Sequence, residues 1–536
     1  MNTLFLKLLA LSAAMAFCLA APGAVAQPGA TGIRSIAAQS LAATPPARSY
    51  DERGWLQRFY APRDFAPAWS EHQARLALAL LQGAGAHGLS AEEYGVDRLR
   101  LQLDNRGAGD PRFDTALTRA MLHYLADLRV GRVRSEYHTA LPDPRLQRFD
   151  PVEQLRAALD GGGLAAAVQA AEPAFPFYAR VKDALAQYRE LAASPHRAVP
   201  AAKKVRAGDD YRGAAQLRAR LLLLGDLPPD PAPAPDNIYT PELADAVRRF
   251  QLRHGLEEDG VLGKETMAAL NVPLDQRVRQ LELTLERLRW LPAFGPGRLI
   301  AVNLPVYRLW ALQLGGDGQQ APLEMRVIVG AAARTETPLF IGQMRYLEFN
   351  PYWNVPRSIA LGEILPKLMR DPGYLAQNDM ELVRADGGKP GSAVSDASLA
   401  ALRAGKVRIR QRPGPQNALG AVKFAMPNPM NIYLHSTSQR ELFERSRRDL
   451  SHGCIRVEKP VELAHFVLGA QPEWTIGSVE MAMAPGPMRK VSLAAPIPVV
   501  LFYATAMVDR EGRVLFARDI YHRDPLLEEA LKAHHD

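Results

Sequence analysis

The stretch Asp449-Leu-Ser-His-Gly-Cys-Ile-Arg-Val457 sets a cysteine between a glycine and strand-forming residues. A second stretch, Ile432-Tyr-Leu-His-Ser-Thr-Ser438, ends a short apolar run at His435, and Cys454 follows nineteen residues later. A thiol nucleophile needs a base within hydrogen-bond reach and donors for the developing oxyanion. Residues 436–450 are long enough for one excursion of the chain. The two stretches therefore predict that Cys454 returns alongside His435 on a neighbouring strand.

Cys454 is the candidate nucleophile of this pair. Gly453 has no side chain to block a substrate carbonyl, so the N–H groups of Gly453 and Cys454 can point at its oxygen. Spacing alone allows either histidine to act as the base. His452 shares a face with Cys454 in an extended chain, whereas His435 approaches from the neighbouring strand. Ser436 or a backbone carbonyl would orient the other ring nitrogen of His435.

Two other interpretations of this cluster are weaker. Zinc accepts His and Cys ligands, but His435, His452, Cys454 and His465 do not have the usual ligand spacing. We therefore expect no metal and no organic cofactor. A buried structural cysteine is common in proteins, yet a cysteine flanked by His, Gly and Ser favours catalysis.

The surrounding sequence predicts a mostly β domain over residues 297–484, which residues 485–536 complete with further strands and a tail. Strand-like segments are 299–312, 324–330, 407–411, 431–435, 474–483 and 499–506. Residues 357–405 interrupt them with a helical pattern, which predicts a capping insertion over one face. Gly373, Gly387, Gly388 and Gly391 would allow this insertion to move like a lid.

The N-terminal half is helical. Residues 50–200 show a 3.6-residue apolar period and predict a helical scaffold domain, and residues 27–49, rich in Ala, Pro, Ser and Gly, predict a flexible tether. A compact unit follows at 208–272, where Thr240 and Pro241 start a helix and Asp259-Gly260 turns the chain. The whole chain is therefore expected to be multidomain α+β.

Two of these segments resemble known families. The text from Ala246 to Thr266 resembles the three-helix peptidoglycan-binding module of wall enzymes, although a spacer without a ligand remains an alternative. His435, fifteen residues, and then Ser451-His-Gly-Cys454 resemble the signature of the L,D-transpeptidase (YkuD-type) catalytic domain. The segments 327–330, 337–338 and 349–356 resemble the large periplasmic YcbB-like subgroup, which combines a helical scaffold, a peptidoglycan-binding module and a capped catalytic domain.

The resemblance implies roles for individual residues. Cys454 becomes the nucleophile, His435 the proton donor and acceptor, and His452 an auxiliary of the oxyanion and substrate pocket. Arg456 stands where many smaller members carry Asn, and a guanidinium there can make a two-point contact with a substrate carboxylate or pair with a protein acid. Trp353 and Tyr352 either line the substrate groove or pack locally.

The resemblance also implies an activity. It is a 3→3 cross-linking reaction between peptidoglycan stem peptides through a cysteinyl thioester, in cell-wall biosynthesis, remodelling and cell shape. Three activities stay open as alternatives: an L,D-carboxypeptidase, attachment of a lipoprotein to peptidoglycan, and an inactive wall-binding scaffold. A cysteine protease is also an alternative, but the papain-type order of Cys before His is missing.

Composition agrees with an exported globular protein. The chain has 536 residues, is 47% hydrophobic and 23% charged, and carries a net charge of +8, which excludes wholesale disorder. The sequence contains no basic run interleaved with aromatic residues, which is the pattern that would indicate nucleic-acid binding. Only two cysteines occur, so a disulfide scaffold is excluded.

The first 26 residues have the pattern of a secretion signal: Lys7, an apolar run from Leu8 to Leu19, and small residues before Gln27. We expect a periplasmic monomer. An uncleaved signal would leave the protein associated with the membrane through its N-terminus.

Overall fold

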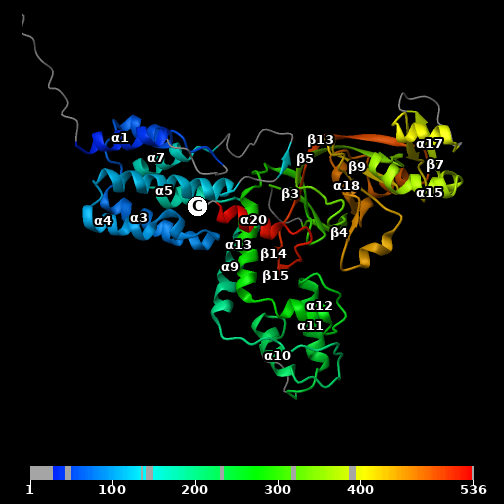
Figure 1. Ribbon diagram of the computed structural model, residues 1–536, viewed down its shortest axis with the longest axis horizontal. Coiled ribbons are helices and arrows are strands. Elements are labelled where there is room, and N and C mark those ends of the chain that lie inside the picture. Colours follow the sequence, from blue (N-terminus) through cyan, green and yellow to red (C-terminus); the bar gives the residue numbers. More distant parts are fainter. Residues whose placement is uncertain are drawn as a thin grey trace, which may run out of the picture.

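The computed structural model describes residues 28–42, 50–133, 137–139, 149–229, 235–315, 321–384 and 394–533. The expected signal segment 1–26 lies outside them. Figure 1 shows a helical domain at the left, a small helical module below the centre, and a sheet-rich domain at the right whose insertion forms the far end. This arrangement confirms the predicted multidomain α+β class.

The N-terminal domain packs its helices around α5, which is buried along most of its length. Its helices are α1 (Pro28–Ala42), α2 (Trp55–Tyr60), α3 (Glu71–Gln82), α4 (Val96–Arg106), α5 (Pro111–Val130), α7 (Pro151–Gly161) and α8 (Leu164–Ala171), with the short turns η1 (Ala61–Arg63), η2 (Gly83–His87) and η3 (Ala91–Tyr94). Side chains cap the main helices: Ser70 accepts from the N–H of Gln73 at the start of α3, and Asp110 accepts from Arg112 at the start of α5.

The prediction of a flexible tether over 27–49 is wrong for residues 28–42. These residues form α1, and its side chains Ile33 and Ala37 are fully buried in the core around α5. The small side chains that suggested flexibility instead allow close packing, because a Cβ on Gly32 would lie 3.1 Å from Pro111.

Helix α9 (Pro176–Ala193) leaves this domain and packs along α13 (Leu274–Arg289). Glu286 of α13 is fully buried and accepts from the backbone N–H of Arg132 at 2.6 Å and from Arg289 at 2.8 Å. Burial alone would raise the pKa of Glu286, but the charges of Arg132 and Arg289 outweigh it and lower this pKa. The cluster fixes the N-terminal domain to α13.

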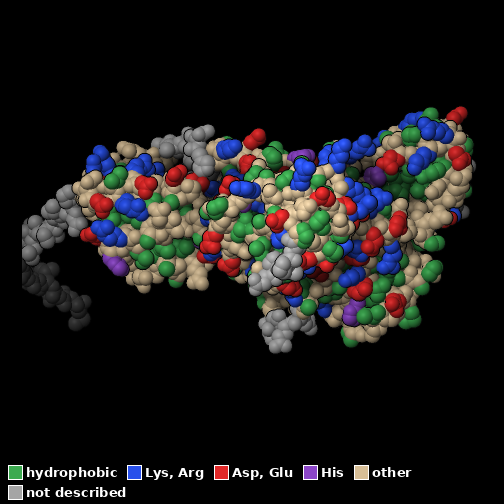
Figure 2. All heavy atoms as spheres, turned by 90° about the horizontal axis from the view of Figure 1, so that it is seen from below, with side chains coloured by type: hydrophobic (Ala, Val, Ile, Leu, Met, Phe, Trp, Pro, Cys, Tyr) green, Lys and Arg blue, Asp and Glu red, His purple; other side chains and the backbone are tan. Residues whose placement is uncertain are grey.

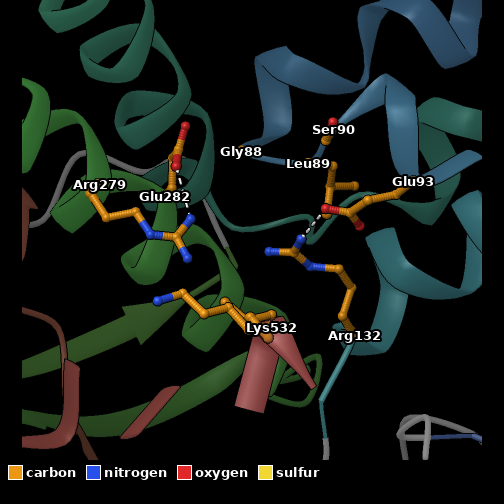
Figure 3. A pocket seen from close by; sticks show the side chains of 9 residues that line it. Gly88, Leu89, Ser90, Glu93, Arg132, Arg279, Glu282 and Lys532 are labelled. Atoms are coloured by element: carbon orange, nitrogen blue, oxygen red, sulfur yellow. Dashed lines mark hydrogen bonds and ion pairs between the residues drawn. The ribbon is translucent and has the colours of Figure 1, made fainter. Parts of the chain in front are cut away.

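The same junction encloses a small cavity of about 130 Å³. Figure 3 shows Arg132 paired with Glu93 on one side of it and Arg279 paired with Glu282 on the other, at 2.6 and 3.0 Å. The first pair lies within the N-terminal domain and the second within α13, so each stabilises one side of the cavity.

The small module consists of α10 (Ala214–Leu223), α11 (Pro241–Arg253) and α12 (Lys264–Leu270) around its own core. Thr240 caps α11 as predicted, since its hydroxyl accepts from the N–H of Leu243 at 3.3 Å. Gly260 has φ +68°, and a Cβ there would lie 3.1 Å from the carbonyl of Ala244. The tight turn before α12 therefore requires glycine.

The main sheet, over the described residues, has the order β1-β5-β13-β2-β3-β4-β12-β10-β9, and β9 also pairs with β5 so that the sheet closes on itself. Its strands are β1 (His138–Thr139), β2 (Gly297–Asn303), β3 (Arg308–Leu314), β4 (Leu323–Gly330), β5 (Phe340–Phe349), β9 (Val422–Ala425), β10 (Leu434–His435), β12 (Ile455–Val457) and β13 (Arg489–Phe502), and β11 (Asp449–Ser451) pairs with β4. Helix α18 (Pro460–Leu468) packs on the core inside this sheet.

The predicted strand at 474–483 is wrong. Residues Ile476–Met483 form helix α19, and Thr475 caps it by accepting from the N–H of Ser478 at 3.2 Å. Val479 packs into the core, whereas Met481 is 73% exposed. A run of apolar residues does not by itself distinguish a strand from a short helix that is half exposed.

The insertion contains a small sheet as well as helices and extends beyond the predicted 357–405 at both ends, so the prediction of a helical insertion was incomplete. Its helices are α14 (Arg357–Ile359), the π-helical turn η4 (Ala360–Ile364), α15 (Leu365–Arg370), α16 (Tyr374–Gln377) and α17 (Asp396–Arg403), and its sheet has the order β6 (Trp353–Asn354), β8 (Val407–Gln411), β7 (Met380–Arg384). It has a hydrophobic core of its own. Gly387, Gly388 and Gly391 lie outside the described residues, and Gly373 has φ −75°, which any residue adopts.

The C-terminal residues pack in two different parts of the molecule. Strand β13 lies between β5 and β2 in the main sheet, but the hairpin β14 (Ala506–Val508)–β15 (Val514–Phe516) packs on α9 and α13. Helix α20 (Arg523–Lys532) also packs against α13. The prediction that 485–536 completes the catalytic domain therefore does not describe the hairpin or α20.

Candidate active site

Strand register brings the two predicted stretches together. Strands β10 and β12 are parallel neighbours, with Leu434 opposite Ile455 and His435 opposite Arg456. Leu434 and Ile455 are fully buried in the core. Because side chains alternate along a strand, His435 and Arg456 point to the other face, and Cys454 shares that face with Arg456. The structure thus places His435 at the end of β10 and Cys454 directly before the neighbouring strand β12, and the alternation of side chains puts both on one face.

The Cys454 thiol is half-buried, and its Sγ donates to the carbonyl of Asn431 at 3.6 Å. Burial raises the pKa of Cys454, and hydrogen bonds from Tyr433 offset this only in part. The resting group is therefore the neutral thiol, which needs a base before it can attack. Asn431 has φ +53°, an unusual conformation that aims its carbonyl at the thiol.

His435 has the properties of that base. Its ring is buried, and Nδ1 lies 2.6 Å from the Ser436 carbonyl. Since a carbonyl only accepts, Nδ1 carries the hydrogen and Nε2 keeps a lone pair. Burial, followed by the positive charge of Arg456, lowers the pKa of His435 to about 3. The ring is therefore neutral at rest and able to take a proton at Nε2.

Ser436 orients His435 through its backbone carbonyl. Its hydroxyl is engaged elsewhere, donating to the carbonyl of Leu419 and accepting from the N–H of Val422, both at 3.1 Å. A Cβ on Gly420, which has φ +61°, would lie 2.3 Å from this hydroxyl. Glycine at 420 therefore leaves the room that the serine needs.

The loop before Cys454 is held by two hydroxyls. Ser451 donates to the Cys454 carbonyl at 2.6 Å and accepts from the Gly453 N–H at 3.1 Å. Thr337 donates to the Gly453 carbonyl at 2.8 Å and accepts from the Gly330 N–H at 2.9 Å. The prediction that the Gly453 N–H faces the substrate is therefore wrong, and the Cys454 N–H remains as the candidate oxyanion donor.

His452 faces the insertion. Its Nε2 lies 2.6 Å from Oε1 of Glu363, and the two side chains are 45% and 48% exposed. Glu363 belongs to the π-helical turn η4, and such turns are frequent at functional sites. The contact connects the insertion to the residue two positions before the thiol. The role of His452 at the oxyanion stays a prediction.

Arg456 pairs with an amide. Its Nη1 donates to Oε1 of Gln439 at 2.7 Å, and its Nε is buried without a hydrogen-bond partner. Burial lowers the pKa of Arg456. A half-buried guanidinium whose Nε has no partner is suited to a carboxylate ligand.

The two predicted aromatic residues have different surroundings. The Tyr352 ring lies under the guanidinium of Arg410, 4.2 Å from its centroid to Cζ. Trp353 begins the insertion sheet, and its indole approaches the Tyr433 hydroxyl. Burial, and after it the nearby Cys454, raises the pKa of Tyr433, which therefore stays a neutral neighbour of the thiol. Sequence reasoning missed Tyr433, Asn431, Thr337 and Glu363 because their proximity depends on tertiary folding.

The catalytic half of the molecule carries much of the visible positive charge. Figure 2 shows Lys and Arg side chains gathered over this half, beside the insertion at the right-hand end.

Among the described residues, no three His, Cys, Asp or Glu side chains are grouped as metal ligands. Of the helices described, none is long and apolar enough to cross a membrane.

A thiol beside a neutral, oriented histidine is able to perform nucleophilic acyl chemistry. Comparison with protein families agrees with this class of site. Residues 297–491 match the "L,D-transpeptidase catalytic domain" (YkuD), residues 213–270 the "Putative peptidoglycan binding domain", and residues 54–185 the "Scaffold domain". The chain thus carries a YkuD-type L,D-transpeptidase catalytic domain together with a peptidoglycan-binding domain.

One curated protein, described as "Putative L,D-transpeptidase" of Haemophilus influenzae, is 33% identical over 304 residues. The match covers 55% of this chain and 59% of that protein.

Proposed function

We propose that the protein is an exported L,D-transpeptidase that forms 3→3 cross-links in peptidoglycan through a thioester on Cys454. The observation that carries the proposal is the pair of Cys454 and the neutral, oriented His435 within the matched catalytic domain. The peptidoglycan-binding domain supports peptidoglycan as the substrate, and both cell-wall domains support a periplasmic location. The similar protein of Haemophilus influenzae is described as "Putative L,D-transpeptidase", which supports the same class of activity.

The first half-reaction acylates the thiol. As the sulfur attacks the carbonyl of the diamino acid at position three of a tetrapeptide stem, Nε2 of His435 takes the thiol proton. The Cys454 N–H stabilises the oxyanion. When the tetrahedral intermediate collapses, His435 returns the proton to the amine of the terminal D-Ala, which leaves. The buried Arg456 charge disfavours the imidazolium, so His435 readily gives this proton up.

The second half-reaction releases the acyl group. A side-chain amine from another stem attacks the thioester, His435 takes a proton from this amine, and the sulfur regains a proton as the new amide forms. Water or a lysine of an outer-membrane lipoprotein would resolve the same thioester as an alternative. The insertion that reaches His452 through Glu363 supports an amine acceptor, because a cover over the thioester excludes water.

Incubation with purified tetrapeptide muropeptides tests this proposal. The wild type should give a mass shift on the protein equal to the acyl group and then cross-linked dimers, whereas Cys454→Ala should give neither. Equal product from both proteins would end the proposal. A product that contains tripeptide alone would replace it with an L,D-carboxypeptidase.

A further inference from the structure

A groove of about 730 Å³ lies between the small module and the rest of the molecule. The module wall is α12, with Lys264 and Ala268. The opposite wall is formed by Gln276 and Gln280 of α13 and by Glu528 of α20. The groove is far along the chain from the thiol, and the mechanism above does not use it.

The two walls are fixed to each other. Arg518 pairs with Glu265 of α12 at 2.6 Å, and Arg253 of α11 donates to the carbonyl of Val514 at 3.2 Å. The buried ring of His254 stacks on Phe516 of the hairpin with 5.8 Å between centroids. The module is therefore docked on the hairpin and α13 through charged, polar and aromatic contacts, so the groove between them has a defined shape.

The chemistry of the walls favours a neutral, hydroxyl-rich ligand. Four of the charged side chains are already paired, since Arg518 pairs with Glu265 and Nε of Arg279 donates to Glu528 at 3.1 Å. Lys264 and Gln276 present exposed donors at the surface, beside the aliphatic Ala268. The lining combines many polar side chains with apolar ones such as Ala268 and Phe516, and this combination matches sugar rings, which carry hydroxyls and an apolar face.

We propose that this groove binds the glycan strand of peptidoglycan, with the module as one wall and α13, β15 and α20 as the other. The inference rests on the proposed function, because the matched peptidoglycan-binding residues 213–270 include α12. It adds that the binding site is shared. The isolated module provides only half of it.

The shared wall also continues towards the catalytic loop. Asp519 lines the groove and accepts from the hydroxyl of Tyr503 at 2.5 Å, and that hydroxyl accepts from the N–H of Tyr521 at 3.0 Å. Tyr521 in turn donates to the carbonyl of Gly330 at 2.7 Å, beside Thr337, which holds Gly453. A glycan strand in the groove is thus connected to the loop of Cys454 through this chain of hydrogen bonds.

Sedimentation of the full chain with purified sacculi, and with glycan strands stripped of peptides by an amidase, tests this site. We compare Ala268→Trp on the module wall and Gln276→Trp on α13, both exposed positions whose new side chain fills the groove. Matched controls are Ala207→Trp and Gln313→Trp, which are exposed and outside the groove. Melting temperature and thiol alkylation verify that each variant is folded.

Both groove variants should bind sacculi and bare glycan about tenfold more weakly, a change of about 1.4 kcal/mol, and both controls should bind as the wild type does. A loss with Ala268→Trp alone would show that the module binds by itself and would overturn the shared site. Unchanged binding in both groove variants would overturn the groove while leaving wall binding intact. Binding of sacculi without binding of bare glycan would point to the stem peptide and also overturn the inference. Failure of the wild type to bind would instead overturn the proposed wall-binding function.

Discussion

The catalytic loop and the insertion above it are held in different ways. Around Cys454, hydroxyls and backbone groups of Ser451 and Thr337 form buried hydrogen bonds of 2.6 to 3.1 Å. The insertion has its own core, and it reaches the loop through the half-exposed pair of Glu363 and His452. A buried network is costly to disturb, whereas a half-exposed ion pair contributes little. From this difference we predict that the geometry of the loop around Cys454 is fixed, whereas the position of the insertion above it can change.

The largest expected effect comes from removing the base. His435→Gln should lower the rate of Cys454 acylation by a tetrapeptide by about a hundredfold to ten-thousandfold, because glutamine cannot take a proton. Intact-protein mass spectrometry over time measures this rate. His465→Gln on α18 is the matched control, and His452→Gln should have a smaller effect than His435→Gln. A larger loss with His452→Gln would reverse the roles of the two histidines.

The protonation state of the thiol gives the next largest effect. Burial raises the pKa of Cys454 above its ordinary value of 9.0 and lowers that of His435 to about 3, so no thiolate–imidazolium pair forms at rest. Alkylation by iodoacetamide should therefore rise about tenfold for each pH unit between about pH 6 and 8, since only the thiolate reacts. A rate that is already constant across neutral pH would contradict this description of the site.

A smaller effect is expected from a substitution that forces a steric clash with Ser436, the residue that orients His435. Gly420→Ala places a methyl group 2.3 Å from the Ser436 hydroxyl, which should cost about 1–3 kcal/mol and slow acylation by displacing the histidine. Thermal melting and the acylation rate measure the two effects. Gly512→Ala is the control, because φ is +80° there and no atom lies within 4 Å of the new Cβ. Equal effects of both variants would mean that backbone strain alone is responsible.

The smallest expected effect is at the cover. Glu363→Ala removes the contact with His452 and should raise the ratio of hydrolysed tripeptide to cross-linked dimer by up to about fivefold, since an exposed pair contributes up to about 1 kcal/mol. Shortening the insertion should change this ratio in the same direction and preserve acylation. Chromatography of the muropeptide products measures it. Glu381→Ala is the control, because it removes ion pairs with Arg410 and Arg412 but leaves the contact with His452. It separates loss of the Glu363–His452 contact from a general loss of stability in the insertion. An unchanged ratio in Glu363→Ala would show that the contact between Glu363 and His452 does not hold the insertion over the site.

The sequence predicted the fold class and the adjacency of the His435 strand to the chain segment of Cys454, because both depend on local patterns. Apolar periods distinguish the helical half from the β-rich half, and a His-Gly-Cys loop after a strand is a short-range feature. The predictions from sequence were wrong at residues 28–42, where the core around α5 orders a segment of small residues. They were also wrong at 476–483, where an apolar run forms a helix. In both segments the deciding interactions come from distant parts of the chain or from a cap.

The sequence by itself determined the candidate residues for the chemistry: a thiol, two histidines and an arginine within twenty-two residues. Only the tertiary structure decided their states and directions. It buried His435 next to Arg456 and kept it neutral, turned the Gly453 N–H to Ser451, and brought Glu363 to His452 across 89 residues of chain. The physical reason is that a residue's type is fixed by the sequence, whereas solvation, charge neighbours and hydrogen-bond partners come from whatever the fold places around it.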